Sequence, residues 1–167
     1  MLFILSLGII WNPAVQFEEE IISDMKSKVN IIGYFDIDFK EYFKDFFYEL
    51  YEDEERWKIG KKYSSVFLED CENNKIIIVI YEFNHEKIEY HPQKKKDVYS
   101  DLNNLKIYIR SKYSKKIDNY VFDNIFHSSD DLEEFKKSYQ ILRKYLMFVL
   151  KDRLESNLEK EMKKRLC

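Results

Sequence analysis

His127 lies in the segment Asn-Ile-Phe-His-Ser-Ser-Asp, residues 124–130, and is one of only three histidines in the 167-residue chain. A neutral imidazole is a good nucleophile near pH 7. The segment leads into a predicted helix, and the first backbone N–H groups of a helix can receive phosphate oxygens. The alternative is a structural role ahead of a helix cap, because Asp130-x-x-Glu133 has the spacing of a capping box and either preceding serine can also cap. The residues alone leave both interpretations open.

Three further groups of side chains have types that suit ligand binding. His85 and His91 flank a short segment, but a metal site needs three or four ligands, so surface histidines are the commoner explanation. Asp36 and Asp38 fall on one strand face, where they either chelate Mg²⁺ or form the solvated side of the strand. The lysines at 94–96 either attract nucleotide phosphates or are only solvated. The sequence has no GxSxG, HExxH or CxxC motif, so hydrolase and zinc-enzyme functions have no support.

Composition narrows the class of protein. The 28 basic and 31 acidic residues leave a net charge of −3, which argues against a dedicated nucleic-acid binder. Cys71 and Cys167 are far apart in the sequence, so we expect no disulfide scaffold and a reducing, cytoplasmic location. The apolar N-terminus lacks a basic region and a small-residue cleavage site and stops at Trp11, too soon to span a bilayer. We therefore expect a buried strand there and no membrane association.

The elements that would position His127 follow from hydrophobic periodicity. Strands are predicted at 2–10, 29–39, 75–83 and 120–126, and helices at 17–28, 40–51, 98–113 and from Asp130 onward. Residues 52–62 are expected to form an exposed extension or loop, and residues 84–97 a polar connection. The alternation of Phe35, Ile37 and Phe39 with aspartates favours an α+β sandwich with helices on one sheet face. A doubly wound parallel sheet is the alternative, although no glycine-rich phosphate loop follows the first strand.

The C-terminal helix has two parts. Its first part, up to Val149, follows the spacing of a core helix, whereas Leu150, Leu154 and Leu158 continue at intervals of four residues. We expect a domain over residues 1–145 and a helical extension over residues 146–167. The extension either packs against a second copy or another protein, or folds back on its own domain.

The histidine segment resembles the active-site signature of the nucleoside diphosphate kinases, which reads Asn, two residues, His, Gly or Ala, Ser, Asp. Upstream, Ile109-Arg110-Ser111-Lys112-Tyr113 is similar to the family's Ile-Arg-Gly-Asp-Phe segment. The first strand and its proline-containing turn are similar to the family's first strand and Lys-Pro-Asp. The similarity is collinear over residues 1–145, and its specific part is the histidine segment.

This resemblance implies a ferredoxin-like βαββαβ core and a histidine that carries a phosphoryl group between nucleotides. By position, His127 would be the phosphorylated nucleophile, Asn124 a nucleotide contact and Arg110 a phosphate clamp. Asn12 takes the place of the family's phosphate-binding lysine, and Ser129 would support the site by hydrogen bonding. Mg²⁺ and ATP or another nucleoside triphosphate would be the cofactor and substrate.

The sequence departs from the family pattern at several positions. Ser128 stands where the family has Gly or Ala, Asp131 where it has a small residue, and Ser138 where it has a glutamate. The expected function is a divergent nucleotide-dependent phosphotransferase with a histidine nucleophile. The alternative is a nucleotide- or protein-binding module of the same fold with altered chemistry, which assembles through its C-terminal helix. A third alternative is a transferase that uses the same histidine as a base.

Overall fold

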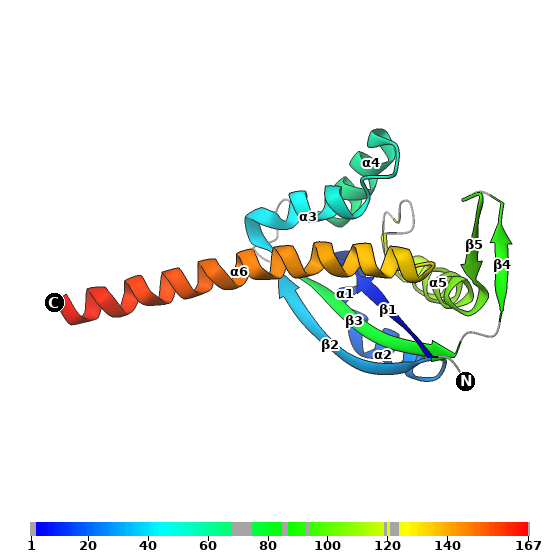
Figure 1. The fold of residues 1–167 in the computed structure, drawn as a ribbon, viewed down its shortest axis with the longest axis horizontal. Helices are drawn as coiled ribbons and strands as arrows, with labels where there is room; N and C mark the ends of the chain where they lie inside the picture. Colours follow the sequence, from blue (N-terminus) through cyan, green and yellow to red (C-terminus); the bar gives the residue numbers. More distant parts are fainter. Residues whose placement is uncertain are drawn as a thin grey trace.

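A four-stranded antiparallel sheet forms the centre of the protein, shown as a computed structural model in Figure 1. The structure describes residues 3–67, 75–84, 87–92, 94–118, 120 and 124–166. The strand order is β2-β3-β1-β6, with β1 Phe3–Ile10, β2 Asn30–Asp38, β3 Lys75–Asn84 and β6 Phe126–Ser128. With the helices that connect them, these strands give the βαββαβ order of a ferredoxin-like fold. The antiparallel pairing rules out the parallel-sheet alternative.

Most of the helices were expected from the sequence. The helices are α1 Asn12–Val15, α2 Glu18–Lys26, α3 Phe43–Leu50, α4 Arg56–Val66, α5 Ser100–Tyr113 and α6 Leu132–Leu166, with 3-10 turns η1 Lys40–Tyr42 and η2 Ser114–Lys116. The loop expected at 52–62 is wrong, because α4 begins at Arg56. The polar connection expected at 84–97 instead contains a two-stranded hairpin, β4 Ile88–His91 and β5 Lys96–Tyr99. Both elements bury few side chains, so their hydrophobic patterns are weak.

The helices cover both faces of the sheet, which corrects the expectation of helices on one face. Buried residues of α2 and α5 pack on the face that carries Ile10 of β1. Residues of α3, α4 and α6 pack on the face that carries Ile9. Neighbouring residues of a strand point to opposite faces, so β3 needs apolar side chains on both sides. The run Ile76–Val79 is accordingly buried at every position.

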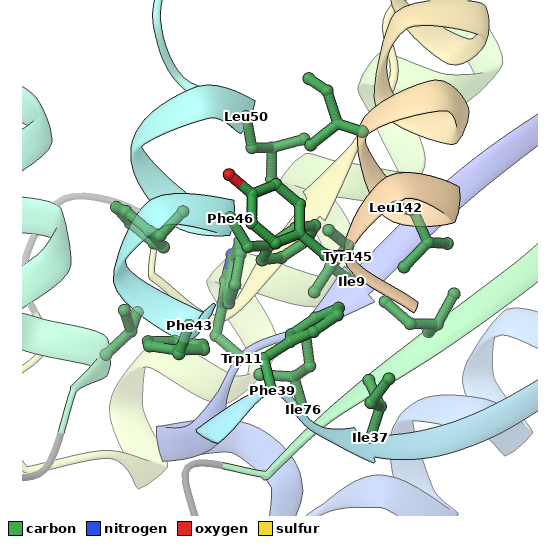
Figure 2. Packing of buried hydrophobic residues seen from close by; sticks show 14 of the residues in the cluster. Ile9, Trp11, Ile37, Phe39, Phe43, Phe46, Leu50, Ile76, Leu142 and Tyr145 are labelled. Atoms are coloured by element: carbon green, nitrogen blue, oxygen red, sulfur yellow. The ribbon is translucent and has the colours of Figure 1, made fainter. Parts of the chain in front are cut away.

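Aromatic rings fill the layer between the sheet and α3 (Figure 2). The Trp11 ring lies 5.1 Å from Phe47, and the Phe39 ring stacks on Phe46 at 4.3 Å. Tyr145 of α6 meets Phe46 edge-on at 5.7 Å. These contacts join the end of β1, α3 and the long α6 into one core.

Helix α6 continues well past the sheet as a single helix, with the C-terminus far from the domain (Figure 1). Its core-facing residues are Ser138, Ile141, Leu142, Tyr145 and Val149. The extension does not fold back on its own domain over the described part, which runs to Leu166. Among the described residues, no helix is both long and apolar enough to cross a membrane.

The last strand begins later than predicted. The strand expected at 120–126 starts at Phe126 in the structure, while residues 121–123 lie outside the described part of the chain. The shift places His127 in the middle of β6 rather than in the loop before α6.

Candidate functional site

His127 is held by strand pairing at the edge of the sheet. It lies opposite Ile9 of β1, so its side chain shares the face of the sheet that carries α3 and α6. The side chain is buried, with only 7% of the residue exposed. The prediction that His127 sits at the mouth of a helix is therefore wrong, because β6 ends at Ser128 and α6 begins at Leu132.

The imidazole of His127 is uncharged and incompletely hydrogen-bonded. Its Nε2 is buried without a hydrogen-bond partner, and the ring meets Tyr51 edge-on at 5.4 Å. Burial lowers the pKa of His127 to about 3; nearby Lys106, Arg110 and Lys62 add to the lowering, and Glu134 opposes it. The ring is therefore neutral throughout the physiological pH range.

Cations from two helices approach the histidine strand. Arg110 of α5 donates from Nε to the Phe126 carbonyl at 3.0 Å, and Lys106, one turn earlier, donates to the Ser128 carbonyl at 3.2 Å. Lys62 of α4 lies 4.4 Å above the Tyr51 ring. Basic side chains of α4 and α5 thus approach His127, and Lys62 is itself paired with Glu54 at 2.6 Å.

Carboxylates in the turn after β6 partner many of these cations. Asp130 is fully buried and forms ion pairs with Lys94 and Lys106. Burial and the neighbouring cations lower the pKa of Lys106, whereas the Asp130 carboxylate favours its charged form. Lys96 contacts Asp131 at 2.7 Å and Glu134 at 3.2 Å. The β4–β5 hairpin is thereby tied to the start of α6.

The start of α6 is capped one residue later than predicted. The Glu134 N–H donates to Asp131 Oδ1 at 2.8 Å, and the Asp130 N–H donates to Glu134 Oε2 at 2.9 Å. The capping pattern is therefore Asp131-x-x-Glu134, which corrects the expectation for Asp130 and Glu133. The N–H groups of Asp130 and Glu134 are therefore engaged by carboxylates of the chain itself.

The remaining predicted site residues surround β6. Asn124 is buried and donates from Nδ2 to the Ser65 carbonyl of α4 at 3.1 Å, while its Oδ1 has no partner. The Ser129 N–H donates to the Leu7 carbonyl at 3.2 Å, and its hydroxyl oxygen is buried without a partner. Asn12 is half-buried in α1, directly after the strand that pairs with β6. The structure thus brings Arg110 to the His127 strand and directs the Asn124 amide towards α4.

Four residues near His127 were not among the expected site residues: Tyr51, Lys62, Lys106 and Glu134. One signal was available for Lys106, because it lies four residues before Arg110 within an otherwise apolar helical pattern. No local signal pointed to Tyr51 or Lys62, which reach the histidine only through the packing of α3 and α4.

The other residues considered as metal ligands do not lie together in the described part of the structure. His91 Nδ1 accepts the Lys94 N–H at 3.3 Å within the hairpin, and His85 and Cys71 lie outside the described residues. Asp36 pairs with Lys75 at 3.1 Å, and Asp38 Oδ1 accepts a hydrogen bond from a backbone N–H. Within the described part of the chain, no three imidazole, thiol or carboxylate groups are placed to hold a metal ion.

A cleft of about 470 Å³ lies elsewhere in the molecule. It is lined by residues around η1 and by the outer part of α6, including Tyr42 and Asp152, whose side chains share a hydrogen bond of 2.8 Å. His127 is not among its lining residues, so the cleft is separate from the histidine site.

Acid should destabilise the protein through His127. The imidazole titrates near pH 6.5 when unfolded and near pH 3 when folded, so the unfolded chain binds the extra proton between these values. Stability is therefore intact above pH 6.5 and declines as the pH falls towards 3. At pH 5 the loss should be about 2 kcal/mol relative to pH 7. Urea unfolding of the protein and of His127→Gln at both pH values measures it, since the variant lacks this dependence; equal pH dependence in both proteins would contradict the prediction.

Known proteins resemble this chain in fold rather than in sequence. No protein-family model matches the sequence, and no curated protein matches it significantly. Solved structures of nucleoside diphosphate kinases are similar in fold. The enzyme from Aquifex aeolicus is 12% identical with a TM-score of 0.56, covering 84% of this chain and 95% of that one. The Borrelia burgdorferi enzyme, with bound vanadate and ADP, is 14% identical with a TM-score of 0.54, covering 84% and 87%.

A nucleoside diphosphate kinase family protein from Babesia bovis is similar at 10% identity and a TM-score of 0.50, covering 82% of this chain and 86% of that one. At such low identities the likeness concerns the fold alone. It supports the ferredoxin-like arrangement expected from the sequence.

Proposed function

We propose that this protein binds a nucleoside triphosphate and transfers its terminal phosphoryl group through His127. One observation carries the proposal: a neutral imidazole with an unpartnered Nε2 lies among the cations Lys62, Lys106 and Arg110. A neutral ring retains its nucleophilic lone pair, and the surrounding positive charge favours the phosphates that would approach it. The fold shared with nucleoside diphosphate kinases supports the same function.

The transfer forms one bond and breaks one. A lone pair on the imidazole attacks the γ-phosphorus, the bond from that phosphorus to the β-phosphate oxygen breaks, and the nucleoside diphosphate leaves. A second nucleotide then takes the phosphoryl group from His127. Arg110 would neutralise phosphate charge, Asn12 and Asn124 would contact the nucleotide, and Ser129 would support the histidine strand. Mg²⁺ would supply further positive charge to the phosphates.

Labelling tests this function directly. With γ-labelled ATP, the protein should acquire an acid-labile label, and His127→Ala should abolish it. His91→Ala is the matched control, because His91 lies in the hairpin away from the β6 strand and should leave labelling intact. Labelling that survives in His127→Ala would refute the assignment.

A nucleotide-binding function without transfer is the second candidate. It is favoured by the burial of His127, because a buried imidazole is poorly placed to reach a phosphorus atom. Under this alternative ATP binds in equilibrium dialysis, Arg110→Ala weakens the binding, and no label appears. The cytoplasm, where thiols stay reduced, is the proposed compartment for either function.

A further inference from the structure

The strand that carries His127 has a free edge, because β6 is the last strand of the sheet. On its other side it bonds to β1 and the residue that follows β1. The Trp11 N–H donates to the Ile125 carbonyl at 3.0 Å, and the Ser129 N–H donates to a carbonyl of β1 at 3.2 Å. Hydrogen-bonded pairs alternate along antiparallel strands, so Phe126 and Ser128 turn their carbonyls away from β1 and towards the free edge.

Side chains of α5 bond both of these outward carbonyls. Phe126 and Ser128 are fully buried, so their carbonyls need partners within the protein. Arg110 Nε donates to the Phe126 carbonyl at 3.0 Å, and Lys106 Nζ donates to the Ser128 carbonyl at 3.2 Å. Four residues of a helix span about 6 Å, and two residues of an antiparallel strand span about 6.8 Å. The spacing of the two side chains therefore matches the spacing of the two carbonyls, and α5 takes the place of a further strand.

We propose that Lys106 is a positioning residue for His127, which lies between the two bonded carbonyls. Helix α5 packs on the face of the sheet opposite to the imidazole, so Lys106 acts through the backbone of β6. Its ion pair with Asp130 keeps the Lys106 side chain beside the Ser128 carbonyl and fixes the turn that follows the strand. A fixed backbone sets the place from which the imidazole lone pair meets a phosphorus atom. The inference rests on the proposed transfer through His127.

Labelling kinetics test this role. Lys106→Met removes the donor, while Asp130 keeps its ion pair with Lys94. At saturating γ-labelled ATP the variant should acquire phosphohistidine about 10- to 100-fold more slowly, because a displaced nucleophile loses its alignment. Its affinity for ATP in equilibrium dialysis should stay within about twofold, since Lys106 meets the strand and not the nucleotide. A loss of affinity with an unchanged rate at saturation would overturn the positioning role.

Two further lysine variants separate the contact with β6 from a general disturbance of α5. Lys106→Arg retains a donor and the positive charge, so it should label faster than Lys106→Met. Lys112→Met is the matched control, because Lys112 lies on the same helix but pairs with Asp24 of α2 at 2.6 Å. It should label at the rate of the unaltered protein. A loss in Lys112→Met as large as that in Lys106→Met would reject a specific role for Lys106.

Amide hydrogen exchange tests the same contact without phosphoryl transfer. By the alternation of pairs, the His127 N–H is bonded to β1 and reports opening of β6, whereas Ile78 in the inner strand β3 reports global unfolding. Lys106→Met should accelerate exchange at His127 about tenfold more than at Ile78. Equal acceleration at both amides would show a loss of global stability only and would overturn the proposal.

The exchange measurement also keeps the two proposals apart. If the unaltered protein acquires no label, the proposed function fails, and exchange at His127 still decides whether Lys106 holds the strand. If Lys106→Met does not fold, Asp130→Asn/Lys106→Met takes its place, because it removes both members of the buried ion pair together. The same difference between His127 and Ile78 is expected in that variant.

Discussion

Replacing Trp11 with alanine should lower the free energy of unfolding by about 3–5 kcal/mol. Trp11 is 1% exposed, and its ring lies 5.1 Å from Phe47, 6.1 Å from Tyr51 and 6.4 Å from Phe43. The substitution loses the transfer free energy of the indole and leaves a cavity at the junction of β1 and α3. It also removes support from Tyr51, the ring that packs against His127. Chemical denaturation followed by circular dichroism measures the loss.

The second tryptophan provides a matched control for this experiment. Trp57 is 55% exposed on α4, and its indole N–H donates to Glu55 at 3.0 Å. Trp57→Ala should change stability by no more than about 0.5 kcal/mol. The same variant leaves Trp11 as the only indole, so its fluorescence should show a buried ring. Equal losses in the two variants would show that the core is not organised around Trp11.

Neutralising Asp130 should cost about 3–5 kcal/mol of stability. Its side chain is 2% exposed and is paired with Lys94 and with Lys106, itself 5% exposed. Asp130→Asn keeps the shape of the side chain but leaves the buried Lys106 ammonium without a counter-charge. Removing one partner of a buried pair is far more costly than removing both. The free energy of unfolding at pH 7 measures the effect.

Two further variants identify the cause of that loss. Asp130→Asn/Lys106→Met should recover a large part of the stability. The double variant also removes the Lys106 ammonium, which would otherwise be buried without a counter-charge. Asp131→Asn should cost less than about 1 kcal/mol, since Asp131 is only half-buried and asparagine caps a helix about as well as aspartate. If Asp131→Asn were as damaging as Asp130→Asn, helix capping rather than the buried pair would explain the result.

Several parts of the architecture could be predicted because their signals are local. The continuous apolar run at Ile76–Val79 predicts a buried strand, and the spacing of Phe43, Phe46, Phe47 and Leu50 predicts a helix with one buried face. Element α4 was missed because it buries only Ile59 and Val66 and shows little periodicity. The placement of helices on both sheet faces was also missed, since a run buried on every side does not say what covers each side.

The candidate site was likewise predictable only where its features depend on local sequence patterns. The sequence by itself determined that His127 precedes a capped helix and that Arg110 lies in the last turn of an amphipathic one, because such patterns depend on neighbours along the chain. Only the tertiary structure decided that His127 is a buried, neutral residue of an edge strand, with cations of α4 and α5 beside it. Burial and charge depend on which distant segments pack together, and local spacing does not encode that packing.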